Sequence, residues 1–397
     1  EHGVALKEGG GYYRWHAGAP PDDAFAAAHA ELTARVDVML EALGAAPLAL
    51  ADVRRDSTGE PFFAKNALGE PISTGAQTAA PSVTRDYVVE AYGAALMDVG
   101  ARRPDVVVLD ADLAADCRTR RFELQLPDRF IENGIAEQDM VSMAGGLARH
   151  GLLPVVNSFA SFLASRANEQ IYNNATERSK VIYVGSLAGL VPGGPGHSHQ
   201  SVRDISALGA VPGMSLLEPF SESEVRAAVD WAVHRAPGSV YLRLVSVPWA
   251  LGFDPPAIDE LVPGQGTVLR SGADGLFVAA GPVMVTAAWH AAEELAGDGL
   301  EFGVTALPWL RDVDGAWLAE VAAGAPIFCL DNHYLVGGQG DAVLAALAAD
   351  APEAAARVRK IGVASIPKSG GNDEVLRAHG LDAESIAARV RATVSRT

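Results

Sequence analysis

Short β-rich segments alternate with helical runs along this chain from Val83 onward, and no other feature of the sequence limits its fold as strongly. Alternation at this spacing is typical of βαβ units, in which a helix connects two parallel strands. The sequence therefore predicts an α/β fold with mainly parallel sheets. The strands expected in the first half are residues 105–109, 153–156, 180–184, 214–217 and 239–243.

A proline-rich break divides this alternation in two. It carries four prolines within residues 248–263, and the β-rich segments resume after it. We expect one doubly wound domain over residues 82–250 and a second, smaller one over residues 264–397. The strands expected in the second domain are residues 275–279, 301–305, 326–330 and 358–361.

Residues 1–81 lack this alternation. Asp22 and Asp23 precede an amphipathic run over residues 24–43, which predicts one helix with an acidic first turn. Residues 45–82 show no sustained periodicity, which indicates an extended connector. This segment is therefore expected to hold a helix and a linker rather than a packed domain.

The balance of charge disfavours two classes of partner. The chain has 49 acidic and 31 basic residues, and its formal net charge of −18 repels a nucleic-acid backbone or an anionic membrane surface. No apolar stretch reaches the roughly 20 residues that a membrane-spanning helix needs. Cys117 and Cys329 are the only cysteines, too few for a disulfide framework or a cysteine-rich zinc module. They suit a reducing compartment, and we expect a cytoplasmic protein.

Ligand sites of doubly wound sheets lie in the loops at the carboxyl ends of the strands. The loop after residues 105–109 contains Asp112 and Asp116, which alone would describe a solvated acidic turn. Glu137 opens a later helix, where the helix dipole favours a carboxylate. Because Ile135 and Met140 flank Glu137 with apolar side chains, it is also placed to share a proton with a ligand nitrogen.

Two further loops contain aromatic and imidazole side chains. Phe159 and Phe162 stand three apart and are expected to share a helix face, which favours a core position over a stacking wall for a flat heterocycle. His197 and His199 lie in a Gly/Pro-rich loop. A metal site there is a weak interpretation, because no third and fourth ligand are nearby. Exposed loop histidines, or imidazoles that contact polar groups of a substrate, are the remaining interpretations.

Taken together, these loops resemble the transketolase group of thiamine-diphosphate enzymes. The resemblance rests on Gly-Ile-Ala-Glu-Gln around Glu137, Ser-Phe-x-x-Phe with Arg-Ala-x-Glu-Gln, and Ser-His-Gln. Residues 82–250 resemble the pyrimidine-binding domain of that group, and residues 331–340 and 371–386 resemble parts of its C-terminal domain. Residues 1–81 resemble the end of a diphosphate-binding domain. The resemblance thus implies a natural second subunit or a fragment of a longer chain.

The resemblance also implies roles for individual residues. Glu137 would hydrogen-bond N1′ of the aminopyrimidine of thiamine diphosphate, and Phe159 and Phe162 would stack on that ring. Asp112 matches an aspartate near the cofactor, and His199 matches a catalytic histidine of the substrate loop. The implied substrate-binding residues are Arg85, Arg166, His197, His199 and Arg243. Of these, Arg85 and Arg243 match the arginines that hold a sugar phosphate in the family.

Several positions depart from the family pattern. The Asp-Gly-Pro-x-His loop lacks its acidic residue and is two residues longer, with His197 as an addition. Asp116 replaces a serine that assists phosphate binding, and Gly185 stands where the family has a histidine. A carboxylate beside a phosphate weakens binding by repulsion, so the resemblance does not imply a phosphorylated substrate.

The function implied first is transfer of a two-carbon ketol unit from a ketose donor to an aldose acceptor. Acyl transfer from pyruvate or another 2-oxo acid, as in deoxyxylulose-phosphate synthases and dehydrogenase β subunits, is the enzymatic alternative. A binding or regulatory subunit without catalysis is the other. The cofactors implied are thiamine diphosphate and Mg²⁺, with the metal ligands on a diphosphate-binding partner subunit or domain. The expected assembly is a homodimer or heterotetramer that acts on small sugars.

Two glycine-rich segments could be mistaken for phosphate-binding motifs. Gly-Asp-Gly at residues 297–299, with Asn332 further on, mimics an element that needs a strand before it and a helix after it. Here a helix over residues 286–295 precedes it and a strand over residues 300–305 follows, so we expect an ordinary turn. Residues 337–340 lack the downstream acidic residue of a dinucleotide site.

Overall fold

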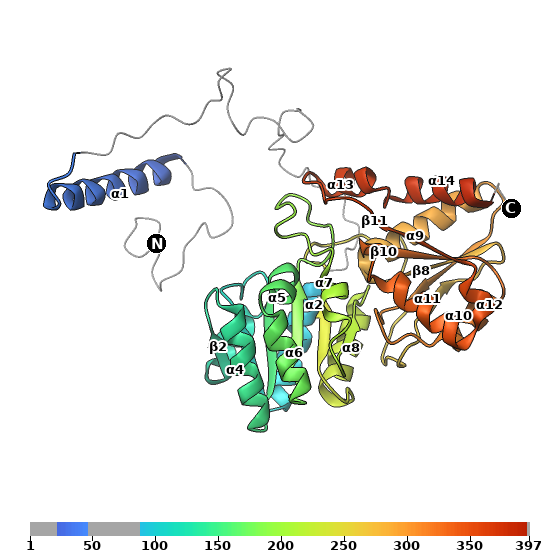
Figure 1. Cartoon of the computed structure of the whole chain (residues 1–397), viewed down its shortest axis with the longest axis horizontal. Coiled ribbons are helices and arrows are strands. Elements are labelled where there is room, and N and C mark those ends of the chain that lie inside the picture. Colours follow the sequence, from blue (N-terminus) through green and yellow to red (C-terminus); the bar gives the residue numbers. More distant parts are fainter. Residues whose placement is uncertain (1–21, 47–87, 395–397) are drawn as a thin grey trace, which may run out of the picture. The chain divides into compact units, whose positions relative to one another are not determined.

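The computed structural model describes residues 22–46 and 88–394 (Figure 1). The chain divides into two compact units. The first contains one described element, helix α1 (Asp22–Ala42), which confirms the helix expected over residues 24–43. The connector predicted for residues 45–82 lies almost wholly outside the described residues. All the other helices and strands belong to the second unit.

The first sheet of the second unit has six parallel strands in the order β2-β1-β3-β4-β6-β5. All five strands expected before residue 250 are present, which confirms the α/β prediction for this half. The additional strand, β2, is a three-residue edge strand and is too short to produce a pattern in the sequence. The strands are β1 (Val106–Asp110), β2 (Phe130–Glu132), β3 (Leu153–Phe159), β4 (Ile182–Ser186), β5 (Ser215–Leu217) and β6 (Val240–Arg243).

Helices cover both faces of this sheet. In β1, Val106 and Val108 pack into the core beneath α2 and α8, whereas Val107 and Leu109 pack into the core beneath α4, α5 and α6. Successive side chains of a strand point to opposite faces, so the burial of all four confirms the doubly wound arrangement. The helices are α2 (Val88–Arg102), α3 (Arg120–Gln125), α4 (Glu137–Arg149), α5 (Ala160–Arg166), α6 (Asn168–Thr176), α7 (Asp204–Leu208) and α8 (Glu222–His234), with a 3₁₀ turn, η1 (Pro127–Arg129).

The second sheet has five strands in the order β11-β10-β8-β9-β7. Its four predicted strands are present and parallel, and β7, which the sequence did not indicate, runs antiparallel at the edge. The strands are β7 (Thr267–Arg270), β8 (Gly275–Ala279), β9 (Phe302–Ala306), β10 (Ile327–Tyr334) and β11 (Val358–Val363). The helices are α9 (Gly281–Ala296), α10 (Gly315–Ala322), α11 (Gln339–Asp350), α12 (Pro352–Ala355), α13 (Asn372–His379) and α14 (Ala383–Val394).

The two glycine-rich segments are structural turns. Residues 297–299 connect helix α9 to strand β9, as expected. At the start of α11, the Asp331 carboxylate accepts hydrogen bonds from Gln339 N over 2.7 Å and from Gly340 N over 3.1 Å, so the protein itself caps this helix. Within the described ranges, every helix is too short or too polar to cross a membrane.

Candidate active site

Four parallel strands of the first sheet end at one edge, and their loops carry the residues singled out in the sequence. The order β2-β1-β3-β4 makes the carboxyl ends of these strands neighbours. Asp112 follows β1, Glu137 follows β2, and Phe159 ends β3. The histidine loop, residues 189–200, follows β4. The fold therefore gathers residues that are distant in the sequence.

Glu137 is the first residue of α4, and only 3% of its surface is exposed. The chain turns toward the helix through Gly134, whose φ of 67° lies in the left-handed region that glycine adopts easily. Glu137 lines an open cavity of about 880 Å³. Met140 beside it is buried, but Ile135 is 72% exposed. The apolar surroundings expected for Glu137 are thus present on its core side only.

Arg166, predicted as a substrate-binding residue, forms an ion pair with Glu137 that the sequence did not indicate. Its Nη1 donates a hydrogen bond to Glu137 Oε1 over 2.6 Å, and its guanidinium carbon lies 4.0 Å from the centre of the Phe162 ring. The contact with Phe162 follows from the spacing of four residues on helix α5. The pair with Glu137 joins two helices, and no spacing rule predicts it. One planar group therefore touches both the carboxylate and the aromatic ring.

Phe159 and Phe162 lie together, but not on one helix face as expected. Phe159 is the last residue of β3 and has an extended backbone, and Phe162 belongs to α5. Their ring centroids are 5.6 Å apart with a tilt of 46°. Phe159 is buried in a small cluster with Leu113 and Cys117, whereas Phe162 is half-buried. The pair thus forms a wall that is anchored in the core at Phe159 and partly open at Phe162.

His199 lies against the same aromatic pair. Its ring centroid is 5.1 Å from that of Phe162, in an edge-on contact, and 5.9 Å from that of Phe159. Its Nδ1 is 2.9 Å from Ser198 Oγ. Burial, together with the charge of Arg166, lowers the pKa of His199 below its ordinary value. The imidazole is therefore mainly neutral at pH 7 and can both donate and accept a hydrogen bond.

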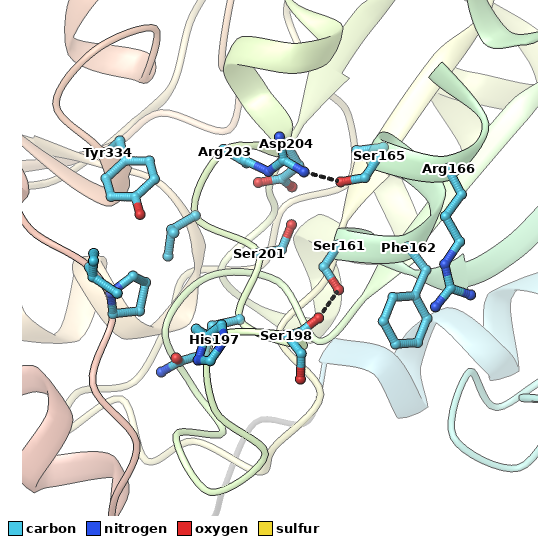
Figure 2. A pocket seen from close by; sticks show the side chains of 15 residues that line it. Ser161, Phe162, Ser165, Arg166, His197, Ser198, Ser201, Arg203, Asp204 and Tyr334 are labelled. Atoms are coloured by element: carbon cyan, nitrogen blue, oxygen red, sulfur yellow. Dashed lines mark hydrogen bonds between the residues drawn. The ribbon is translucent and has the colours of Figure 1, made fainter. Parts of the chain in front are cut away.

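His197 lines a different cavity, of about 430 Å³, between α5 and the end of the histidine loop (Figure 2). Arg203 lines it too, and its Nη2 donates to Ser165 Oγ over 2.9 Å. Tyr334 and residues 366–367 contribute to this cavity from the second sheet and its connections. Sequence reasoning missed Arg203, although it stands close after the histidines, and nothing in the sequence pointed to Tyr334.

Asp112 is exposed and has a φ of 62°. Its backbone N–H donates to Glu132 Oε1 over 2.8 Å, and the same oxygen accepts from Gly134 N over 2.7 Å. Glu132 thus links the loop of Asp112 to the turn that leads into Glu137. Within residues 22–46 and 88–394, no group of three or more His, Cys, Asp or Glu side chains could hold a metal ion.

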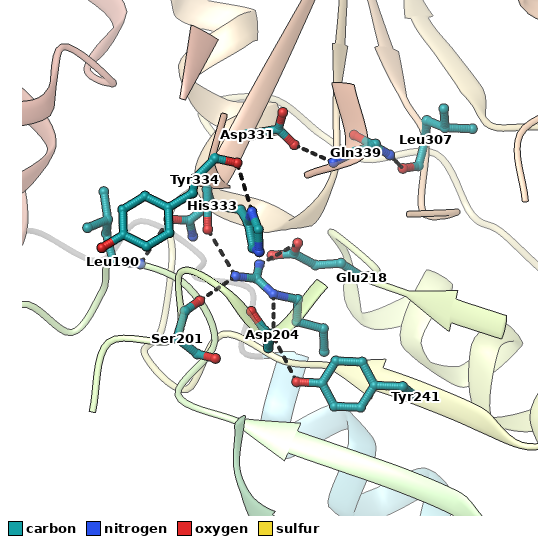
Figure 3. A network of polar contacts seen from close by, with 12 residues as sticks. Leu190, Ser201, Asp204, Glu218, Tyr241, Leu307, Asp331, His333, Tyr334 and Gln339 are labelled. Atoms are coloured by element: carbon teal, nitrogen blue, oxygen red, sulfur yellow. Dashed lines mark hydrogen bonds and ion pairs between the residues drawn. The ribbon is translucent and has the colours of Figure 1, made fainter. Parts of the chain in front are cut away.

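The structure does not support the prediction that Arg243 binds a substrate phosphate. Arg243 ends β6 and has no exposed surface. Its guanidinium pairs with Asp204 at 2.8 Å and with Glu218 at 2.6 Å, so its charge is used inside the protein. Figure 3 shows the polar network that contains these two carboxylates. The loop sequence alone could not reveal these two carboxylates. Arg85, the other predicted phosphate ligand, lies outside the described residues.

Comparisons with known proteins agree with this arrangement. A family model for the transketolase pyrimidine-binding domain matches residues 87–245, and one for the transketolase C-terminal domain matches residues 264–386. The chain is 33% identical over 279 residues to the 6-deoxy-6-sulfo-D-fructose transketolase subunit SqwH of Clostridium sp. (strain MSTE9). This match covers 70% of this chain and 84% of that protein. The chain belongs to the transketolase family.

Two other matches show the range of the family. A solved structure described as a split gene transketolase, inactive beta4 tetramer, is 33% identical to this chain, with a TM-score of 0.69. The match covers 78% of this chain and 99% of the chain in that structure. The 1-deoxy-D-xylulose-5-phosphate synthase of Chlorobium luteolum (strain DSM 273 / BCRC 81028 / 2530) is 31% identical over 255 residues. That match covers 64% of this chain but only 40% of the synthase.

The site residues divide between the two matched domains. Glu137, Phe159, Phe162 and His199 lie in the part that matches the transketolase pyrimidine-binding domain. Tyr334 lies in the part that matches the C-terminal domain. The 430 Å³ cavity is therefore lined by both parts of this transketolase-family chain.

Proposed function

We propose that this chain is the pyrimidine-binding part of a thiamine-diphosphate-dependent transketolase, which transfers a two-carbon ketol unit from a ketose donor to an aldose acceptor. The observation that supports this most directly is the position of Arg166. Its planar guanidinium forms a hydrogen bond to Glu137 and lies over the Phe162 ring at the same time. A flat ring with a nitrogen at its edge can make the same two contacts.

The residues present fit a pyrimidine ring. Glu137 is a buried carboxylate that can share a proton with a ring nitrogen, and Phe162 offers a partly exposed aromatic face. The guanidinium of Arg166 has to leave that face before a ring can stack there. Because the Arg166 side chain is 44% exposed, it can move without opening the core.

The bound cofactor would supply the nucleophilic carbon that accepts the ketol unit. Glu137 would hold a proton at a pyrimidine nitrogen, and Phe159 and Phe162 would exclude water from the ring. His199 would exchange hydrogen bonds with a hydroxyl or carbonyl oxygen of the sugar, since its imidazole is neutral and lies beside the aromatic pair. We place Asp112 at the cofactor, because Glu132 ties its loop to the Glu137 turn.

We assign Arg166 and His197 to the substrate side, because both line the 430 Å³ cavity next to Phe162. Arg243 is left out, since its guanidinium is buried and paired. An anionic substrate group would meet Arg166 and Arg203 in this cavity. In this proposal, recognition of an anionic substrate group does not require Arg243.

We further propose a partner chain or domain that binds the diphosphate and carries the Mg²⁺ ligands. Two relatives support a divided enzyme, because one is called a subunit and another is a split gene transketolase. A reducing, cytoplasmic location is consistent with two buried cysteines that are not disulfide-bonded, Cys117 and Cys329. The purified chain with thiamine diphosphate and Mg²⁺ should show no turnover until the partner is added.

The test of the catalytic assignment is Glu137→Gln in the reconstituted enzyme. The amide keeps the size of the side chain but cannot share a proton, so we expect ketol transfer to fall by roughly 10²–10⁴-fold. The thermal unfolding temperature should change little. Glu353→Gln, an exposed position on α12, is the matched control and should retain full activity. If Glu137→Gln retains full turnover, Glu137 is not a catalytic residue, and a binding or regulatory subunit becomes the favoured interpretation of this chain.

Acyl transfer from a 2-oxo acid is the second candidate. The match to a 1-deoxy-D-xylulose-5-phosphate synthase favours it. Donor profiling of the reconstituted enzyme separates the two reactions. Ketol transfer predicts turnover with ketose donors and none with pyruvate, and the reverse pattern would replace the first proposal by the second.

A further inference from the structure

The histidine loop has little regular structure of its own. No helix or strand falls within residues 189–200, and the hydrogen bond from Gly189 N to Ser201 O, at 2.9 Å, closes its base. Inside the loop, the backbone bonds converge on Gly193 and Gly196. A loop of this kind takes its shape from what surrounds it. In this protein, several of its contacts come from the C-terminal part of the chain.

The first contact holds the start of the loop. Asn332, in strand β10, accepts a hydrogen bond from Leu190 N at its Oδ1 over 2.9 Å. The neighbouring Gly189 packs so closely that a Cβ on it would lie 2.0 Å from Asn332 Nδ2. The backbone φ of Gly189 is 79°, a second reason for glycine at this position. Asn332 is thus directly fitted to the base of the loop.

The second contact holds the middle of the loop. Asn372, the first residue of α13, accepts a hydrogen bond from Gly193 N at its Oδ1 over 3.0 Å. Gly370 N returns a bond to Gly193 O over 3.3 Å. A Cβ on Gly193 would lie 2.6 Å from a methyl carbon of Val375. The turn before α13 and the loop are therefore in direct backbone contact.

The third contact holds the end of the loop. Gln200 is buried, and its Nε2 donates to Lys368 O over 3.0 Å and to Leu190 O over 2.9 Å. The two ends of the loop and the C-terminal part of the chain meet at this amide. His197 and His199 lie between the second contact and the third. Their positions are therefore bracketed by groups that belong to residues 368–372.

We propose that Asn332 and Asn372 are positioning residues for catalysis, through which the C-terminal domain holds the histidine loop in place. By fixing Leu190 and Gly193, they keep His199 against the edge of Phe162, where it reaches the substrate. The role of His199 in this inference rests on the proposed function. Tyr334 and residues 366–367, which line the adjoining cavity, place the same domain at the substrate side as well.

Hydrogen exchange of the purified chain tests the contact without reference to activity. Asn372→Leu removes the acceptor with little change of size, and we expect exchange at Gly193 to rise by about tenfold, the effect of losing one hydrogen bond. Asn372→Asp keeps an oxygen at this position and should keep the protection. Asp373→Asn, exposed on the next position of α13, is the matched control. Equal exchange in Asn372→Leu and the original chain would overturn the proposal.

Kinetics of the reconstituted enzyme test the consequence. Asn372→Leu should raise KM for the sugar by about tenfold and lower kcat less, and Asn372→Asp should restore both values. The domains are also joined away from the loop, where Arg311 Nη1 donates to Val211 O over 2.7 Å. Arg311→Gln should leave KM unchanged. If Arg311→Gln raises KM as much as Asn372→Leu does, the contacts serve domain association alone and the proposal fails.

Different measurements would refute the proposed function and the positioning role of Asn372. If the reconstituted enzyme is inactive with every donor tested, the proposed function is refuted. The exchange measurement would still decide whether Asn372 holds the loop. An active enzyme in which Asn372→Leu mobilises the loop and leaves KM unchanged would refute the positioning role alone. The same pair of measurements on Asn332→Leu, read at Leu190 N–H, repeats the test at the base of the loop.

Discussion

A guanidinium without exposed surface has to find its hydrogen-bond acceptors inside the protein. Arg243 donates to the carboxylates of Asp204 and Glu218 and to the backbone oxygens of Ser201 and Asn332. Two carboxylates surround one cation, and burial by itself disfavours the charged form of all three groups. The nearby Arg243 nevertheless holds the pKa of Asp204 below its ordinary value despite that burial. Arg243 thus links Ser201, the residue that follows the histidine loop, to Asn332 in strand β10.

We predict that Arg243→Met destabilises the fold rather than selectively weakening substrate binding. The change leaves Asp204 and Glu218 buried without their cation, a loss of about 3–5 kcal/mol in the free energy of unfolding. Urea denaturation followed by circular dichroism measures it. Adding Asp204→Asn and Glu218→Gln to the same variant should recover part of the loss. If Arg243→Met leaves the free energy of unfolding unchanged and selectively raises KM for phosphorylated sugars, Arg243 is a substrate-binding residue after all.

At the scale of elements, the sequence predicted the central strands and helices well. Strands with both faces buried, such as β1 and β8, appear as short apolar runs that can be recognised. The edge strands β2 and β7 were missed, because β2 is too short and β7 is largely unburied, so neither leaves such a run. The boundary between β3 and α5 was also missed. It falls between Phe159 and Phe162, which sequence spacing had placed on one helix.

Helix α4, which carries Glu137, contains two adjacent glycines in different surroundings. A Cβ on Gly145 would lie 2.0 Å from Asn174 Oδ1, whose amide nitrogen donates to Val141 O and Tyr183 Oη. We therefore predict that Gly145→Ala destabilises the protein by about 1–3 kcal/mol and lowers activity, because α4 or Asn174 has to shift. A Cβ on Gly146 would meet no atom within 4 Å. Gly146→Ala should stabilise by about 0.5–1 kcal/mol, since alanine favours helices.

Thermal or urea unfolding of both variants, with activity of the reconstituted enzyme, checks the Gly145 prediction. The two substitutions add the same methyl group one position apart, so their difference reports packing against Asn174 and not helix propensity. Equal stability of Gly145→Ala and Gly146→Ala would show that α4 has room to shift. In that case the position of Glu137 would not depend on the fit between α4 and α6.

At the scale of the whole molecule, the long-range contacts are what the sequence could not supply. Motifs correctly placed the candidate loops at one sheet edge, because parallel strands end there together. The pairs that shape the candidate site are set by the tertiary fold: Arg166 with Glu137, Arg203 with Ser165, and Asn332 with Leu190. Side chains that meet across so many intervening residues leave no periodicity to recognise. Their identification requires coordinates.

Buried carboxyl groups also give the whole molecule a pH-dependent stability. Burial raises the pKa of Asp110 to about 7, of Asp331 to about 7 and of Glu224 to about 8. In the unfolded chain such groups titrate near pH 4, so at higher pH the folded state retains protons that the unfolded state releases. The free energy of unfolding then falls as pH rises. The lowered pKa values of His199 and His333 act oppositely, but mainly below about pH 6.5.

We therefore predict a lower free energy of unfolding at about pH 8.5 than at about pH 6.5, with a slope of at most about 1.4 kcal/mol per pH unit for each retained proton. Urea denaturation across this range measures it. Glu224→Gln keeps an acceptor for Phe220 N, which donates to Glu224 over 2.7 Å, and should remove the part of the decline near pH 8. Glu384→Gln, an exposed position on α14, should leave the decline intact. A free energy that stays level, or rises, between these pH values would mean that the buried carboxyls are already ionised in the folded protein.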